Sequence, residues 1–187
     1  IEGLITLMGG QEKFIGRLDS LFIAESKIEG PLVSSDISGL IGQYAHGNEP
    51  SHHIVHLYNY VNQSWKTQQL IDTILHTQYF NNPNGLSGNE DCGQMSAWYV
   101  LNAMGFYQVC PGSPIYSVGR PIFDKVTINL PNGKVFEIIA NNNSRTNKYI
   151  QSIRLDNILL ESPFFMHSDI MKGGKIVMEM GNTPVKQ

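Results

Sequence analysis

The chain has little cysteine, no long apolar run and no excess charge of one sign. Its two cysteines are too few for the disulfide framework of a small secreted domain. No run of apolar residues reaches membrane-spanning length, so no membrane span is expected. With a formal charge of −3 and scattered Lys and Arg, the sequence lacks the basic patch that binds nucleic acid or an anionic membrane.

The first residues lack the features of a complete N-terminus. Residues 1–7 contain no initiator Met and no helix cap, and their pattern is that of a helix interior that ends at Met8-Gly9-Gly10. No basic stretch followed by an apolar one indicates a signal peptide. We therefore expect a fragment. Its partner is then the remaining N-terminal part of the parent protein, and any targeting signal lies upstream.

The residue pattern changes near Gly105. Before it, apolar residues recur at helical spacing over residues 14–22, 54–61, 70–75 and 95–99, which predicts antiparallel helix pairs, as in an α/α toroid. After it, β-branched residues alternate on both sides of Asn132-Gly133, which predicts a β-hairpin. Residues 149–155 and 175–180 are further candidate strands. The predicted fold class is α+β, with a helical part at 1–105 and a β region at 106–187.

A first polar cluster, Gly47-Asn48-Glu49-Pro50-Ser51-His52-His53, lies where a loop enters a helix. Pro50 disfavours helical backbone at Glu49 and so holds this residue extended. One carboxylate with amide and carbonyl oxygens suits a hard cation such as Ca²⁺, with Glu49 and Asn48 as ligands. An equally weighted alternative is an N-terminal cap, with Glu49 favourably placed near the helix dipole.

The histidines of this cluster allow another reading. His52 and His56 lie four positions apart (i, i+4), which on an α-helix is the spacing of two zinc ligands. The metalloprotease pattern, however, requires Glu at the position of His53, and no third ligand is evident. For His56 we expect a hydrogen-bonded histidine within the helical part, and for Cys92 a buried, unreactive thiol.

A second polar cluster runs from Gly88 to Tyr99 and enters a helix predicted at residues 93–104. It brings together acids, amides and large rings: Asn89, Glu90, Asp91, Gln94, Trp98 and Tyr99. Sugar hydrolysis uses carboxylates for proton transfer, amides for hydroxyl groups and aromatic faces for the C–H side of a pyranose. The structural alternative is that Asp91 only caps the helix.

Both clusters, with four further segments, carry a family resemblance. The further segments are Gly105-Phe106-Tyr107, Val109-Cys110-Pro111-Gly112-Ser113, Tyr149-Ile150-Gln151-Ser152 and residues 169–174. Together they resemble the C-terminal part of glycoside hydrolase family 92, the calcium-dependent α-mannosidases. The resemblance implies helical hairpins of an (α/α)₆ barrel, followed by a sandwich-like β region or by strands that complete a sheet of the parent.

The resemblance also implies an activity and a location. The activity is exo-hydrolysis of terminal mannosides of N-glycans, with α-1,2 linkage and with inversion. A calcium ion contacts the sugar, and the ligand is a mannose-containing glycan. By the same resemblance the parent protein is secreted, periplasmic or on the cell surface of a bacterium.

The family's functional positions map onto both clusters. Asp91 matches the general base and Asn89 a residue that assists it, although Asn89 stands where other members have Asp. Glu49 matches the carboxylate that binds calcium, and Asn48 is a candidate second ligand. We expect the substrate to be bound by His52, His53, Gln94 and Trp98.

The general acid has no match in this chain. An inverting glycosidase needs two carboxyl groups about 6.5–9.5 Å apart, and the resemblance places the acid in a Glu-Gly-Asn segment upstream of Ile1. We interpret Glu2 as a helix residue, so the fragment alone is expected to be inactive. The alternatives are a calcium-dependent carbohydrate-binding module without hydrolytic activity and, less favoured, a zinc hydrolase built on His52 and His56.

Overall fold

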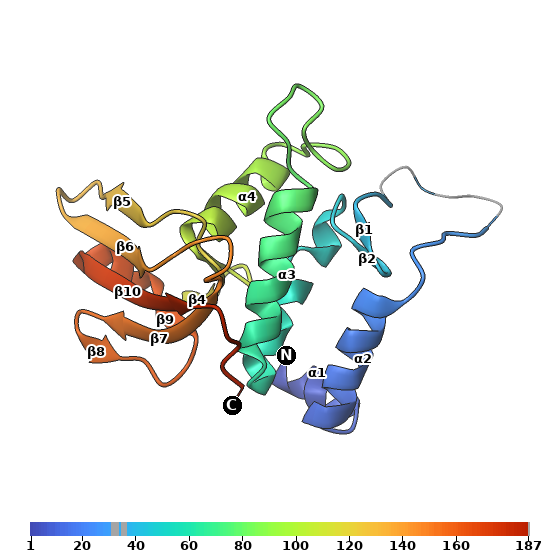
Figure 1. Cartoon of the computed structure of the whole chain (residues 1–187), viewed down its shortest axis with the longest axis horizontal. Coiled ribbons are helices and arrows are strands. Elements are labelled where there is room, and N and C mark those ends of the chain that lie inside the picture. The colour runs from blue at the N-terminus through green and yellow to red at the C-terminus, as the bar shows by residue number, and fades with distance from the viewer. Residues whose placement is uncertain (31–33, 35–36, 187) are drawn as a thin grey trace.

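The computed structural model describes residues 1–30, 34 and 37–186. Most helices and most strands occupy separate parts of the molecule, and helix α3 (Ser64–Thr77) lies near its centre (Figure 1). The pattern change near Gly105 coincides with the end of helix α4 (Gln94–Met104). Gly105 stops this helix with φ 104°, a backbone conformation that favours glycine.

The helical part follows the predicted spacing with one difference. The first helix ends at Leu7, with Met8 as its C-cap, next to the predicted Met8-Gly9-Gly10 stop, and the stretches around Phe14, Leu70 and Trp98 form α-helices. Residues 54–61 instead form a 3₁₀-helix, which has three residues per turn. The remaining elements before α3 are α1 (Glu2–Leu7), α2 (Gln11–Ile23), β1 (Leu40–Ile41), β2 (Tyr44–Ala45) and the 3₁₀-helices η1 (Glu49–Ser51) and η2 (Ile54–Val61).

The β part confirms the predicted hairpin and strands. Strands β5 (Lys125–Asn129) and β6 (Val135–Asn141) pair antiparallel on either side of Asn132-Gly133. The candidate strands at 149–155 and 175–180 are β7 (Tyr149–Leu155) and β10 (Gly174–Gly181). The other elements are β3 (Phe106–Tyr107), β4 (Ile115–Val118), β8 (Ile158–Leu159), β9 (Phe164–Met166) and helix α5 (His167–Lys172).

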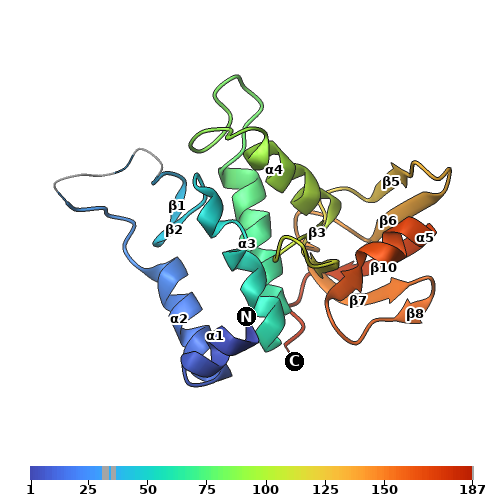
Figure 2. The ribbon, with the colours of Figure 1, turned by 180° about the vertical axis from the view of Figure 1, so that it is seen from behind.

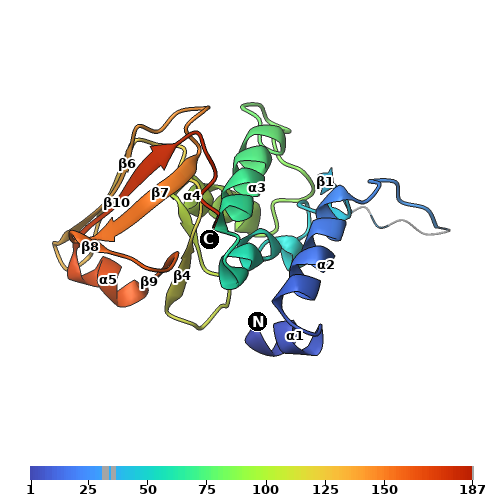
Figure 3. The same ribbon diagram turned by 60° about the horizontal axis from the view of Figure 1, so that its bottom comes forward.

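These strands form two sheets that share one core. The larger sheet has the order β5-β6-β10-β7-β8, and the smaller has the order β3-β4-β9. Strand β10 is parallel to β6, whereas the other strand pairs of the described residues are antiparallel. Phe165 of the smaller sheet stacks on Phe136 of the larger one, with 6.3 Å between ring centroids. The two sheets therefore pack face to face in the sandwich-like arrangement predicted (Figure 3).

The helical part packs around Trp98, a fully buried residue of α4. Its core cluster joins Tyr44, Val55 and Ile71 to Trp98, and it also includes Tyr107 of β3. Seen from behind, α4 lies beside α3 and leads directly into β3 (Figure 2). The helical core thus continues into the first residues after Gly105. The domain boundary at 105/106 and the complete (α/α)₆ barrel stay predictions.

A buried ionic cluster joins the helical part to the β part. Asp72 of α3 lies 3.3 Å from the Nε of Arg120 and 3.2 Å from the Nζ of Lys148. Arg120 is itself buried, and its guanidinium donates a hydrogen bond to the backbone oxygen of Ser144. Because both Asp72 and Arg120 are shielded from water, each depends on the other for charge compensation. No helix in the described part of the chain is long and apolar enough to cross a membrane.

Candidate active site

The two polar clusters meet through their glycines. Gly88 has φ +76°, and a Cβ added to it would lie 2.4 Å from the backbone oxygen of Gly47. A Cβ on Gly47 would in turn overlap the side chain of Ser38, at 2.0 Å. Only glycine allows both backbones to approach this closely. The loop after β2 and the loop before α4 are therefore held against each other, 41 residues apart in the chain.

Side-chain hydrogen bonds continue this contact. The indole Nε1 of Trp98 donates to the backbone oxygen of His52 at 3.0 Å. The side-chain amide of Gln94 lies 3.2 Å from the Nδ1 of His52 and donates to the hydroxyl of Tyr107 at 3.2 Å. Residues of both clusters and of β3 thus form one connected unit.

Four of the predicted site residues line a single pocket of about 470 Å³. They are Glu49, His52, His53 and Gln94. The rest of the lining comes from Tyr107 and the segment after β3, which includes Gln108, Val109 and Pro111. Asn48 directly precedes Glu49 and is half-buried. Asp91 and Asn89, the predicted catalytic residues, are not among the residues that line this pocket. The wall that follows β3 was not predicted.

Trp98 does not have the role predicted for it. Its side chain is 0% exposed, so its ring does not offer a face to a sugar. It lies beneath the pocket instead and supports His52 through the hydrogen bond to its backbone. In this position Trp98 contributes to the shape of the pocket without lining it.

His46, which the sequence analysis did not single out, lies in the same buried layer. Its Nδ1 is 2.9 Å from the hydroxyl of Tyr44, and its Nε2 is 2.7 Å from the hydroxyl of Tyr79. Burial, with a smaller contribution from His52, lowers the pKa of His46 to about 3. His46 immediately precedes the first cluster, which is the only signal in the sequence that pointed to it.

Glu90 binds the first turn of helix α4. Its carboxylate accepts hydrogen bonds from the backbone N–H of Ser96 at 3.1 Å and from the Ser96 hydroxyl at 3.0 Å. Glu90 therefore supplies a side-chain cap for this helix. Asp91 is exposed, as are Asn89 and Cys92, so the expected burial of Cys92 was wrong.

The backbone at Asp91 is unusual. Asp91 has φ 50° and Cys92 has φ 57°, and Gly93 follows with φ 92°. Non-glycine residues in this region carry strain of order 1–3 kcal/mol each, and such strain concentrates at functional sites. Consecutive left-handed residues turn the chain sharply before α4 and determine where the Asp91 side chain projects.

The zinc reading of His52 and His56 does not fit the structure. His56 is buried, with its Nδ1 3.1 Å from the hydroxyl of Ser117 and its Nε2 2.9 Å from the Oδ1 of Asn102. His52 lies before the start of η2 (Ile54–Val61), so the two histidines do not share one helix, and the i, i+4 spacing of two helical zinc ligands does not apply. His56 is the hydrogen-bonded histidine expected, and burial lowers its pKa to about 4.

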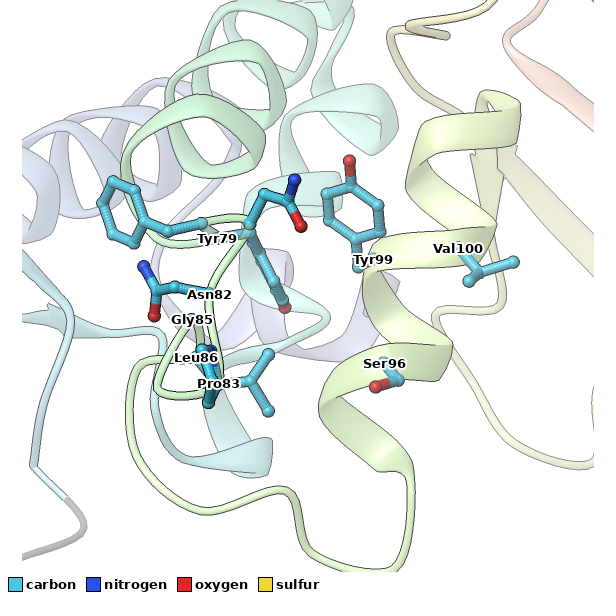
Figure 4. Close-up of a pocket in the computed structure, with 10 residues that line it drawn as sticks. Tyr79, Asn82, Pro83, Gly85, Leu86, Ser96, Tyr99 and Val100 are labelled. Atoms are coloured by element: carbon cyan, nitrogen blue, oxygen red, sulfur yellow. The ribbon is translucent and has the colours of Figure 1, made fainter.

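A larger pocket, of about 540 Å³, lies between the turn after α3 and one face of α4 (Figure 4). Tyr79, Tyr99 and the exposed Phe80 contribute rings to it, and Asn81 and Asn82 contribute amides. Its lining includes no carboxylate and no histidine. Hydrolysis of a glycoside requires carboxyl groups, so the pocket that contains Glu49 is the better candidate active site.

The sequence model of the glycosyl hydrolase family 92 catalytic domain matches residues 1–182. The chain belongs to this family. The segments whose resemblance to family 92 was noted above thus include both loops that form the pocket.

Solved family 92 structures share the fold. A family GH92 α-mannosidase of Bacteroides thetaiotaomicron, in complex with mannoimidazole, is 43% identical with a TM-score of 0.88, and the match covers 94% of this chain and 23% of that one. A family GH92 inverting mannosidase of the same organism is 40% identical with a TM-score of 0.83. This match covers 98% of this chain and 26% of the mannosidase. The "uncharacterized secreted glycosidase" of Arthroderma benhamiae is 28% identical over 95% of this chain and 21% of its own length. The chain spans about a fifth to a quarter of these relatives.

The calcium ion implied by the resemblance to family 92 can be compared with the donors present. Glu49 lines the pocket and Asn48 adjoins it, and oxygen donors of these kinds suit Ca²⁺. Ca²⁺ takes six to eight oxygen ligands, whereas the described residues contain no group of three His, Cys, Asp or Glu side chains that could hold a metal. Asn48 and Glu49 therefore fit such an ion in kind but supply only part of its coordination.

The Gly47–Gly88 contact predicts a specific loss of stability. Gly88→Ala should destabilise the fold by about 1–3 kcal/mol more than Gly133→Ala, because the new methyl group overlaps the Gly47 backbone. Gly133 is a matched control, since its φ is +79° but a Cβ there meets nothing within 4 Å. Urea unfolding of both variants measures the difference. Equal midpoints would show that the two loops are not in contact.

The buried histidines predict a loss of stability in acid. A folded-state pKa below the unfolded value of 6.5 means that the neutral form stabilises the fold, fully above pH 6.5 and progressively less as the pH falls toward about 4 for His56 and about 3 for His46. The free energy of unfolding should therefore decrease from pH 6.5 to 4. In His56→Gln this slope should be smaller by up to about 1.4 kcal/mol per pH unit, as measured by denaturant unfolding at several pH values. Parallel curves for the two proteins would contradict the burial of a neutral His56.

Proposed function

We propose that this chain forms part of the active site of an exo-acting, inverting α-mannosidase. The observation that carries the proposal is the pocket in which Glu49, His52, His53 and Gln94 come together from two distant loops. Support comes also from the two Bacteroides relatives, an α-mannosidase that binds mannoimidazole and an inverting mannosidase. The ligand proposed is the terminal mannose of a glycan. The α-1,2 linkage and the N-glycan source rest on the family resemblance alone.

In this proposal Asp91 is the general base that removes a proton from the attacking water. Its loop is held at one end by the bonds from Glu90 to Ser96 and at the other by the Gly47–Gly88 contact. Such fixed geometry is what general base catalysis requires. Asn89, two residues earlier, is proposed to orient the same water through its side-chain amide. The general acid is proposed to come from a part of the catalytic domain outside these 187 residues.

We propose Glu49 and Asn48 as calcium ligands from this chain. When bound, the ion would supply positive charge and orientation for the hydroxyl groups of the sugar. His53 is half-buried in the same pocket, and burial lowers its pKa. A neutral imidazole does not repel a cation bound beside Glu49, whereas a positively charged imidazolium would.

A carbohydrate-binding module without hydrolytic activity is the second candidate. It would use the same pocket and the same ligand, and would differ only in lacking a general acid. A secreted location is proposed for the parent protein by analogy with the Arthroderma relative. Assays of turnover separate the two candidates.

The role of Asp91 predicts a large kinetic effect. The test uses the full-length protein, in which this chain is part of a complete family 92 catalytic domain. There Asp91→Asn should lower kcat about 10²- to 10⁴-fold with little change in KM, because an amide does not accept the proton of water. Hydrolysis of an aryl α-mannoside and of α-1,2-linked mannobiose measures the effect. Glu90→Gln is the matched control and should retain most activity, since its amide oxygen still accepts from Ser96.

The same assays test whether the general acid lies outside this chain. The 187-residue chain alone should not turn over either substrate, because it lacks the proposed acid. Turnover by the isolated chain would place the acid within it. Near-normal activity of Asp91→Asn on the disaccharide would remove Asp91 from the role of base.

The calcium proposal predicts reversible loss of activity on chelation. Removing divalent cations from the complete enzyme should lower hydrolysis, and added Ca²⁺ should restore it. Glu49→Gln should raise the Ca²⁺ concentration needed for half-maximal recovery, because one ligand loses its charge. Full activity in the presence of chelator would refute a calcium requirement.

A further inference from the structure

The amide of Gln94 is held in one orientation by two neighbours in the candidate active site. Its nitrogen lies 3.2 Å from the Nδ1 of His52 and 3.2 Å from the hydroxyl oxygen of Tyr107. These contacts use both hydrogens of the amide nitrogen. Among the described residues the amide oxygen makes no hydrogen bond, so it remains for a ligand in the pocket that Gln94 lines.

The tautomer of His52 determines this orientation. The Nε2 of His52 lies 3.0 Å from the backbone oxygen of His46, and because a carbonyl only accepts, Nε2 must carry a hydrogen. In the neutral ring Nδ1 is then an acceptor and matches the N–H of Gln94. The reverse orientation of the amide would need hydrogens on both ring nitrogens. With a neutral ring, only the observed orientation satisfies both contacts of His52.

The position of His52 is itself fixed from below. Trp98 donates to its backbone oxygen, and the carbonyl of His46 accepts from its ring. The side chain of His46 contacts the hydroxyls of Tyr44 and Tyr79, so it has little freedom to turn. A continuous set of hydrogen bonds therefore leads from the buried aromatic layer to the amide oxygen of Gln94.

We propose that His52 is a positioning residue that fixes the Gln94 side-chain oxygen as a hydrogen-bond acceptor for one hydroxyl group of the bound sugar. With the carboxylate of Glu49, this oxygen makes the pocket rich in acceptors. Such a pocket favours ligands that present several O–H donors, as a pyranose does. The recognition of a sugar rests on the proposed function, whereas the tautomer and the amide orientation do not.

The tautomer is tested on the 187-residue chain without ligand. In a long-range ¹H–¹⁵N NMR spectrum, His52 should show a protonated Nε2 and an unprotonated Nδ1 at neutral pH. The side-chain amide protons of Gln94 should show nuclear Overhauser contacts to the ring of Tyr107. A protonated Nδ1, or amide protons directed away from Tyr107, would overturn the proposal whatever the enzyme's activity.

Recognition is tested with methyl α-mannoside and with derivatives in which one hydroxyl at a time is replaced by fluorine, which does not donate. One derivative should bind the chain about three- to ten-fold more weakly, the effect of one hydrogen bond. This penalty should disappear in Gln94→Met and persist in Gln108→Met, a matched amide of the pocket wall. Binding is also measured to the full-length protein that contains this chain. If that protein binds methyl α-mannoside but no derivative binds more weakly, the recognition role of Gln94 is refuted; if it does not bind the sugar at all, the proposed function fails as well.

The role of His52 is tested by two replacements. His52→Phe keeps an aromatic ring but removes both nitrogens, so the side-chain amide of Gln94 can turn. The loss of affinity caused by the fluorine replacement should then become smaller. His52→Asn should restore it, because its side-chain oxygen can accept near the position of Nδ1. An unchanged penalty in His52→Phe would refute the positioning role. A shift of the Gln94 side-chain signals with Ca²⁺ alone would make Gln94 a cation ligand and would also overturn the proposal.

Discussion

The close approach of the Gly47 and Gly88 backbones decides whether the two polar loops form one site or two. The hydrogen bonds of His52 with Gln94 and Trp98 connect the loop after β2 to helix α4, which the second loop enters. Such hydrogen bonds act over about 3 Å, so they form only after the loops have been brought together. A side chain at Gly88 would overlap the backbone of Gly47 and push the two loops apart.

Much of the fold was predictable because local rules agree with the final structure. The alternation around Asn132-Gly133 predicts a hairpin from neighbouring residues alone, and the helix that ends at Gly105 follows from a glycine that can adopt positive φ. The parallel pairing of β10 with β6 was not predictable in this way, because it joins strands far apart in the chain. The 3₁₀ geometry of η2 was missed for a related reason, since the spacing of its apolar residues suits either helix type.

The sequence indicated which residues lie near the candidate site, but not which of them line the pocket and which are buried. The motifs correctly associated Glu49, His52, His53 and Gln94, because loops at helix starts project polar side chains into a shared space. Whether an aromatic residue of such a motif faces a ligand or the core depends on the surrounding packing. That is why Trp98 was assigned to the sugar but is buried, and why His46 beneath it was missed. The bonds that Glu90 accepts from Ser96 likewise depend on a turn whose φ angles no short pattern reveals.

The ionic cluster at Asp72 bears on how the two parts of the chain hold together. The carboxylate belongs to α3, whereas Arg120 and Lys148 follow Gly105 in the chain. Opening either part alone would leave a buried charge without its counterpart, at a cost of several kcal/mol. The change from helix to strand at residue 105 is therefore bridged by a buried ion pair as well as by the backbone. The same helix, α3, thus packs against the pocket side of the molecule and anchors the β-sandwich through its carboxylate.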